Sequence, residues 1–260
     1  MKPEIGIQLY TLRDHIQTPD DFDSTLSRLH TLGVRYVQIS GIGDFPAETQ
    51  REILDKYDMK VCVTHKPVEK ILGETEKQIS EHKAIGCDSI GLGMPPESYR
   101  GSAEKVRKLI EEIKGISPLL KENNMTFNYH NHAFEFYRLD DMVCSMMDIL
   151  LEETDPDYFC FIPDAAWIHY AEQNPIEILG KMRGRVKVLH FKDYIINNKK
   201  ERHFVSLGKG IVNLEECYKA ACELEIPYIM YEQDNDFTDG DPFRSLEESW
   251  AYLKELEARF

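Results

Sequence analysis

Short apolar segments alternate with longer amphipathic segments along the whole chain, and this alternation restricts the fold more than any other feature. Strands are predicted at 5–10, 36–39, 60–64, 89–92, at the start of 127–136, and at 158–162, 186–191 and 228–231. Apolar residues at helical spacing, together with capping residues, predict helices at 20–32, 48–57, 68–85, 103–121, 139–153, 174–182, 214–224 and 243–256. Gly115 and Pro118 predict a kink or an interruption in the helix at 103–121.

Eight strand–helix units in this order predict a parallel sheet. No long linker and no change in composition divides the chain, so we expect a single α/β domain over residues 1–260, a (β/α)8 TIM barrel. A doubly wound open sheet is the competing fold. It is disfavoured because the sequence after the first strand is LYTLR, at 9–13, and not the Gly-rich turn of dinucleotide-binding sheets.

The chain is acidic, with 46 Asp and Glu against 31 Lys and Arg and a net charge of −15. This charge repels phosphate groups, so we expect neither nucleic acid nor a membrane as a partner, and a homo-oligomer is left open. The six cysteines contain no CxxC pair, which favours reduced, buried thiols. The N-terminus lacks the pattern of a signal peptide, so a cytoplasmic protein is expected, although a chain with a removed signal peptide would look the same.

Ionisable side chains follow the apolar part of most of the later strands. In chain order they are His65, His130, His132, Asp164, His190, Lys192, Asp193 and Glu232. The C-terminal ends of barrel strands converge on one mouth, where the active sites of this fold lie. We therefore expect these side chains to form one site. The alternative is that histidines such as His130 are satisfied by hydrogen bonds in a packed setting.

Asp164, His190 and Glu232, with His130 as a fourth residue, predict a metal site. Their oxygen and nitrogen donors, without a thiolate, suit one divalent ion such as Mn, Co, Zn or Mg. Such an ion could bind two oxygens of a hydroxy-carbonyl substrate, polarise the carbonyl and stabilise an enediolate when the adjacent carbon loses a proton. Aldose–ketose isomerases and ketose epimerases use this chemistry. The alternative is that these groups only hydrogen-bond one another.

The order of several motifs resembles that of the sugar phosphate isomerase/epimerase superfamily, the xylose-isomerase-like TIM barrels. The motifs are GIQLYTLR at 6–13, YHNH at 129–132 followed by EF at 135–136, PDAAWIH at 163–169, GRV at 184–186, HFKDY at 190–194, GKG at 208–210 and YE at 231–232. The resemblance covers essentially the whole chain. It implies one divalent metal ion held by a Glu, an Asp, a His and a Glu on the fifth to eighth strands, and Asp164, His190 and Glu232 match the last three.

The fifth-strand position departs from the family pattern, because the chain reads HNH at 130–132 where many relatives read Glu-Asn-His. In the sugar epimerases of this superfamily two glutamates exchange protons on opposite faces of the substrate, so an imidazole at this position argues against that reaction. His130 can still bind metal or transfer a proton, and we expect Glu232 and His130 to be catalytic. Residues expected to contact the substrate are Arg13, His65, His132, Glu135, Trp167, His169 and Lys192.

The leading functional hypothesis is a metal-dependent isomerase or epimerase of a small sugar or sugar derivative. A lyase that eliminates a β-substituent from an oxidised keto sugar would pass through the same enolate and is the second hypothesis. A sugar-binding barrel without catalysis is the third, motivated by His130. The endonuclease branch of the superfamily is disfavoured by the acidic charge and by the shortage of His and Glu ligands for a metal cluster.

Overall fold

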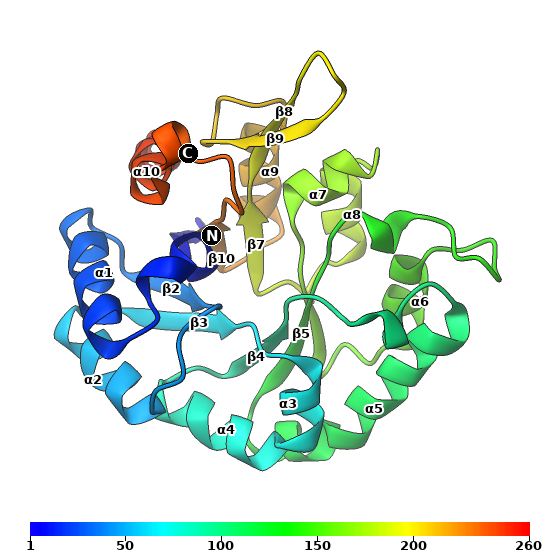
Figure 1. Cartoon of the computed structure of the whole chain (residues 1–260). Coiled ribbons are helices and arrows are strands. Elements are labelled where there is room, and N and C mark those ends of the chain that lie inside the picture. The colour runs from blue at the N-terminus through cyan, green and yellow to red at the C-terminus, as the bar shows by residue number, and fades with distance from the viewer.

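Eight parallel strands close into a barrel in the computed structural model, which describes residues 1–260 (Figure 1). The barrel strands are β1 (Glu4–Gln8), β2 (Tyr36–Ile39), β3 (Lys60–Thr64), β4 (Ser89–Leu92), β5 (Thr126–His130), β6 (Phe159–Ile162), β7 (Val188–Phe191) and β10 (Tyr228–Tyr231). They form two ladders, β3-β2-β1-β10-β7 and β4-β5-β6. Backbone hydrogen bonds join the ladders, from Lys66 N–H to Gly91 O (2.8 Å) and from His190 N–H to Pro163 O (2.8 Å). The predicted TIM barrel is confirmed.

Helices surround the strands as an outer layer (Figure 1). They are α1 (Pro19–Thr31), α2 (Ala47–Lys56), α3 (Val68–Gly73), α4 (Thr75–Ala84), α5 (Ala103–Glu122), α6 (Met146–Glu153), α7 (Ala165–Tyr170), α8 (Pro175–Lys181), α9 (Leu214–Glu223) and α10 (Pro242–Arg259). Short 3-10 turns lie at Leu9–His15, Glu97–Tyr99, Phe134–Phe136 and Thr238–Gly240. None of the helices combines the length and the apolar character that crossing a membrane requires.

The predicted interruption of the helix at 103–121 is wrong, because α5 runs through Gly115 and Pro118 without a break. Proline has no N–H to donate to the carbonyl four residues earlier, which here belongs to Lys114. The Ser117 hydroxyl donates to Lys114 O instead, at 2.9 Å. A side chain next to the proline therefore replaces the missing backbone hydrogen bond.

Other element boundaries also differ from the predictions. The helix predicted at 68–85 is divided into α3 and α4 at Glu74, whose φ of −131° and ψ of 36° are not helical. The helix predicted at 139–153 begins only at Met146, where Ser145 and Asp148 form a reciprocal capping box. At these positions the apolar period predicts a longer helix, but local backbone conformation and capping set the actual boundaries.

An antiparallel hairpin, β8 (Asp193–Ile196) and β9 (Arg202–Val205), occupies a segment for which the sequence analysis predicts neither a strand nor a helix. It extends beyond the end of β7 (Figure 1). The Asp193 carboxylate holds the base of the hairpin, since it accepts backbone N–H groups of Tyr194, Gly208, Gly210 and Val212 at 2.9–3.1 Å. Asp193 is therefore used for structure at this end of β7.

Apolar side chains form the floor under the mouth of the barrel. Val188 and Met230 are fully buried and belong to one cluster with Cys62. They precede His190 and Glu232 by two residues, and alternate residues of a strand share a face, so they lie one layer deeper in the barrel. The polar side chains at the strand ends consequently rest on a dry, packed layer.

Candidate active site

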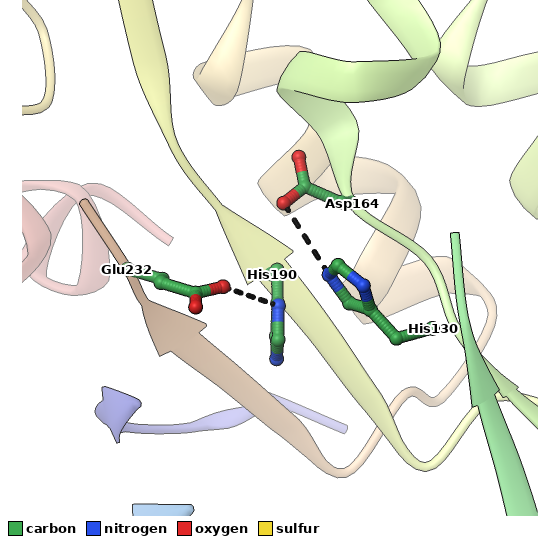
Figure 2. A group of neighbouring side chains, drawn as sticks. All are labelled: His130, Asp164, His190 and Glu232. Atoms are coloured by element: carbon green, nitrogen blue, oxygen red, sulfur yellow. Dashed lines mark ion pairs between the residues drawn. The ribbon is translucent and has the colours of Figure 1, made fainter. Parts of the chain in front are cut away.

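Four predicted ligands meet at the C-terminal ends of neighbouring strands. His130 ends β5, Asp164 follows β6, His190 lies in β7 and Glu232 follows β10. One nitrogen or carboxylate oxygen of each residue lies within 4.8 Å of the others (Figure 2). All four residues are at least 96% buried, since their exposed fractions are 2%, 0%, 0% and 4%. The barrel thus assembles the four side chains that the sequence analysis selected.

The atoms that face the centre of this group lack hydrogen-bond partners. They are His130 Nε2, Asp164 Oδ2, His190 Nδ1 and Glu232 Oε2, one from each residue. His130 Nε2 lies 3.7 Å from Asp164 Oδ2, and His190 Nδ1 lies 3.0 Å from Glu232 Oε2. An unpaired buried polar atom costs about 1–3 kcal/mol, and one partner at the centre of the group would satisfy all four atoms. Two imidazole nitrogens and two carboxylate oxygens fit a divalent metal ion.

Hydrogen bonds on the outer side of the group orient the two imidazoles. His190 Nε2 lies 2.7 Å from Gln38 Oε1, and His130 Nδ1 lies 3.2 Å from Gly93 O. Both oxygens are acceptors, so the outer ring nitrogens carry the protons and the inner nitrogens present lone pairs to the centre. Outer partners of this kind are typical of metal-binding histidines.

Asp164 has a separate task for each of its oxygens. It is the N-cap of α7, where Oδ1 accepts the N–H groups of Ala166 and Trp167, both at 3.0 Å. The second oxygen, Oδ2, remains free to face the centre. Helix α7, which was not predicted, therefore fixes the direction of the carboxylate oxygen that faces the centre.

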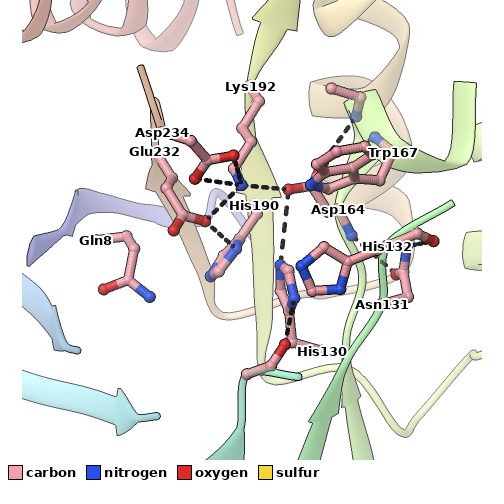
Figure 3. Close-up of polar contacts among 12 residues, drawn as sticks. Gln8, His130, Asn131, His132, Asp164, Trp167, His190, Lys192, Glu232 and Asp234 are labelled. Atoms are coloured by element: carbon pink, nitrogen blue, oxygen red, sulfur yellow. Dashed lines mark hydrogen bonds and ion pairs between the residues drawn. The ribbon is translucent and has the colours of Figure 1, made fainter. Parts of the chain in front are cut away.

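Lys192 is buried among three carboxylates (Figure 3). Its Nζ lies 3.0 Å from Glu232 Oε2, 3.5 Å from Asp164 Oδ2, and 3.0 and 3.1 Å from the two oxygens of Asp234. The sequence analysis missed Asp234. A signal was present, because Asp234 follows Glu232 by two residues and an extended chain would place both on one side.

Burial and neighbouring charges fix the protonation of the site. Burial, together with the neighbouring imidazoles of His190 and His132, holds the pKa of His130 well below its usual range, so this ring is neutral. Burial alone would lower the pKa of Lys192, but Asp234, Glu232 and Asp164 outweigh it and raise the pKa. Burial also opposes the charge of Glu232, yet the Lys192 ammonium holds the pKa of this carboxyl well below its usual range. The site thus combines the neutral imidazole of His130 with the charged carboxylate of Glu232 and the charged ammonium group of Lys192.

A cavity of about 840 Å³ opens above these residues. Five of the predicted substrate contacts line it, namely Arg13, His65, His132, Trp167 and Lys192, together with His130 and Glu232. Arg13 is also bound to the chain, because its guanidinium donates to Tyr10 O and Asp234 O at 2.9 and 3.0 Å. The cavity is large enough for a small sugar above the four convergent side chains.

Glu135 and His169 are not among the residues that line this cavity. Glu135 is fully buried, where its carboxylate accepts the Tyr129 hydroxyl at 2.9 Å and the His132 N–H at 2.8 Å. His169 Nδ1 contacts the Tyr194 hydroxyl at 2.7 Å. The structure thus places Glu135 beneath the loop that carries His132, and His169 beside the base of the hairpin.

Residues 26–256 match the family model described as xylose isomerase-like TIM barrel. The chain belongs to this family. An inosose dehydratase from Clostridium perfringens (strain 13 / Type A) is 22% identical over 90% of this chain and 89% of that protein. The resemblance inferred from the motifs is confirmed.

Solved structures of other proteins superpose along almost the whole chain. A sugar phosphate isomerase/epimerase from Parabacteroides distasonis ATCC 8503 has a TM-score of 0.82 and 21% identity, with 98% of each chain covered. A probable 3-DHS dehydratase from Bacillus anthracis has a TM-score of 0.73 and 14% identity, with 98% of this chain and 99% of that chain covered. At these identities the likeness establishes the fold, and the activity must be argued from the site.

Proposed function

We propose that this protein is a metal-dependent lyase that removes water from a small polyhydroxy ketone, either a keto sugar or a keto cyclitol. The observation that carries the proposal is the convergence of four unpaired buried donor atoms at the floor of the cavity. His130, Asp164, His190 and Glu232 would hold one divalent ion there. When bound, such an ion polarises a ketone and lowers the cost of removing a proton from the adjacent carbon.

The side chains around the cavity can supply the remaining steps. The C–H bond next to the ketone breaks and its proton passes to the carboxylate of Glu232, which lines the cavity. The electron pair forms a C=C bond, and the C–O bond to the hydroxyl on the next carbon breaks. His132, which also lines the cavity, donates a proton to that hydroxyl, which leaves as water. The buried Lys192 ammonium stabilises the negative charge that develops on substrate oxygen.

Two observations favour elimination over epimerisation. Epimerisation needs acid–base groups on opposite faces of one carbon, and this site has an imidazole, His130, where the two-glutamate epimerases carry their second carboxylate. Elimination needs one base and one acid on neighbouring atoms, which Glu232 and His132 provide. The relative from Clostridium perfringens is named inosose dehydratase, and its reaction class agrees with this assignment.

An isomerase or epimerase of a small sugar is the second candidate. The initial proton transfer is the same, and the Parabacteroides distasonis structure, with a TM-score of 0.82, is described as a sugar phosphate isomerase/epimerase. In that case the proton would return to a carbon atom and no water would leave. The two candidates therefore differ in the fate of one intermediate.

Product mass distinguishes the candidates. Protein stripped of metal and then loaded with Mn²⁺, Co²⁺, Zn²⁺ or Mg²⁺ is incubated in D₂O with inosose and with neutral and phosphorylated ketoses. Elimination yields a product lighter by one water, whereas isomerisation retains the skeleton and adds deuterium. His130→Gln should abolish either reaction, while His30→Gln, which changes an exposed histidine of α1, should not. Deuterium exchange without loss of water would refute the lyase, and binding without exchange or turnover would support the non-catalytic barrel.

A further inference from the structure

Lys192 contacts the same two oxygens that the proposed metal site requires. Its Nζ lies 3.0 Å from Glu232 Oε2 and 3.5 Å from Asp164 Oδ2, and both atoms are without hydrogen-bond partners in the centre of the ligand group. A carboxylate oxygen that binds a divalent ion cannot keep a close contact with an ammonium group pointing at the same lone pairs. Lys192 and a metal ion are therefore competitors for Glu232 and Asp164.

Asp234 is a third carboxylate, and it is not one of the four residues whose donor atoms converge. Both of its oxygens contact Lys192 Nζ, at 3.0 and 3.1 Å (Figure 3). Its backbone oxygen accepts from the Arg13 guanidinium at 3.0 Å, which ties the residue to the first βα loop. Asp234 is therefore held against Lys192 and tied to the first βα loop, without being one of the convergent residues.

The surroundings of Lys192 offer its ammonium group no other charged partner. The residue is 2% exposed, and the rings of Trp167 and Phe204 lie 5.8 and 5.7 Å from its Nζ. A buried charge without a partner is strongly destabilising. When Glu232 and Asp164 bind a metal ion, Asp234 is the carboxylate that remains paired with the Lys192 ammonium group.

The charges of the site balance only when Asp234 is counted. Asp164, Glu232 and Asp234 offer three negative charges, while Lys192 offers one positive charge and a divalent ion would offer two. His130 and His190 would bind through neutral rings. Without Asp234 the metal-loaded site would hold an excess positive charge in a buried setting.

We propose that Lys192 competes with the metal ion for Glu232 and Asp164, and that Asp234 is the positioning residue that holds the ammonium when the metal binds. This inference rests on the metal site of the proposed function. It also gives Lys192 a role when the metal is bound. An ammonium group released from two carboxylates has N–H donors available for a substrate oxygen, and Lys192 lines the cavity.

Mn²⁺ affinity, measured by isothermal titration calorimetry on stripped protein, tests the proposal without any assay of activity. Asp234→Asn should weaken binding by about tenfold or more, as for other residues that support metal ligands. Glu69→Gln is the matched control, because Glu69 lines the same cavity and has no contact with Lys192. It removes the same charge and should change the affinity by less than about twofold.

A double-mutant cycle separates positioning from simple attraction between Asp234 and the metal. Lys192→Met removes the competitor, so Asp234→Asn should lose most of its effect in that background. Circular dichroism verifies that each variant is folded, and Lys192→Gln replaces Lys192→Met if the latter is not. If neither folds, the comparison of Asp234→Asn with Glu69→Gln decides.

Two results would overturn the inference. One is an equal loss of affinity from Asp234→Asn with and without Lys192, and the other is an equal loss from Asp234→Asn and Glu69→Gln. If the unsubstituted protein binds no divalent ion, the proposed function itself fails. That outcome is distinct from tight binding in which Asp234 has no effect.

Discussion

Asp164→Asn should separate the two tasks of Asp164. The asparagine keeps a side-chain oxygen for the N–H groups of Ala166 and Trp167, which Oδ1 now accepts at 3.0 Å each. It replaces Oδ2, which faces the convergent donors, by an NH₂ group that cannot bind a metal ion. Asp164→Ala removes both functions. The pair of variants thus tests the helix cap and the metal ligand independently.

The structure sets the size of each effect. Asn and Asp are similar N-caps, so Asp164→Asn should retain the cap, whereas Asp164→Ala should cost an additional 0.5–2 kcal/mol, roughly, of unfolding free energy. Metal present at 100 times its dissociation constant stabilises a folded protein by about 2.7 kcal/mol. For a domain of this size that corresponds to a rise in Tm of roughly 5–11 °C. Asp164→Asn should lose this rise.

Thermal unfolding followed by circular dichroism, with EDTA and then with Mn²⁺, measures both effects. Ser145→Ala is the control, because it removes an N-cap of α6, where Ser145 Oγ accepts the Asp148 N–H at 3.1 Å, far along the chain from any ligand. This variant should lose stability in EDTA and keep the full Mn²⁺ shift. A full Mn²⁺ shift in Asp164→Asn would refute the ligand assignment, and equal Tm values for the two Asp164 variants in EDTA would refute the cap.

Three further predictions concern residues around the site. Tyr129→Phe removes the hydroxyl that donates at 2.9 Å to the buried Glu135 carboxylate, so urea denaturation should show a loss of about 1.5–3 kcal/mol. Burial lowers the pKa of His82 from 6.5 to about 4. The unfolded chain therefore takes up the proton first, and the free energy of unfolding should decrease as the pH falls from 6.5 to about 4. In denaturation series over this pH range, His82→Gln should show a smaller decrease. Gly210→Ala would place a methyl group 2.1 Å from Asp193 Oδ1, and calorimetry should show a destabilisation of about 1–3 kcal/mol.

The barrel was predictable from the sequence because its signal is local and repeated. Each strand, such as β3 (Lys60–Thr64), is a short apolar segment followed by a helix, and this pattern needs no knowledge of distant residues. The predicted helix boundaries are wrong where another local interaction overrides the preference of a residue. Pro118 predicts a break because it has no N–H. The Ser117 hydroxyl donates to Lys114 O in place of that N–H, and the helix continues.

The ligand group was also predictable, since its members occupy the same place in successive βα units. Asp164, His190 and Glu232 each follow or end an apolar strand, and the fold brings such ends together. The role of Glu135 was not predictable. It is three residues from His132 and looks like a second carboxylate for the mouth, but the Tyr129 hydroxyl and the His132 N–H hold it below the cavity.

The sequence by itself determined the architecture, the edge of the barrel at which the candidate site lies, and the chemical types of its four convergent side chains. These properties follow from periodicity and order along the chain. Only the tertiary structure decided how the charges are paired. β10 lies beside β7, with Met230 opposite His190, and this neighbourhood brings Glu232 and Asp234 to Lys192 about 40 residues earlier in the chain. Pairing energies depend on distance and burial, and neither is encoded in the spacing of residues along a chain.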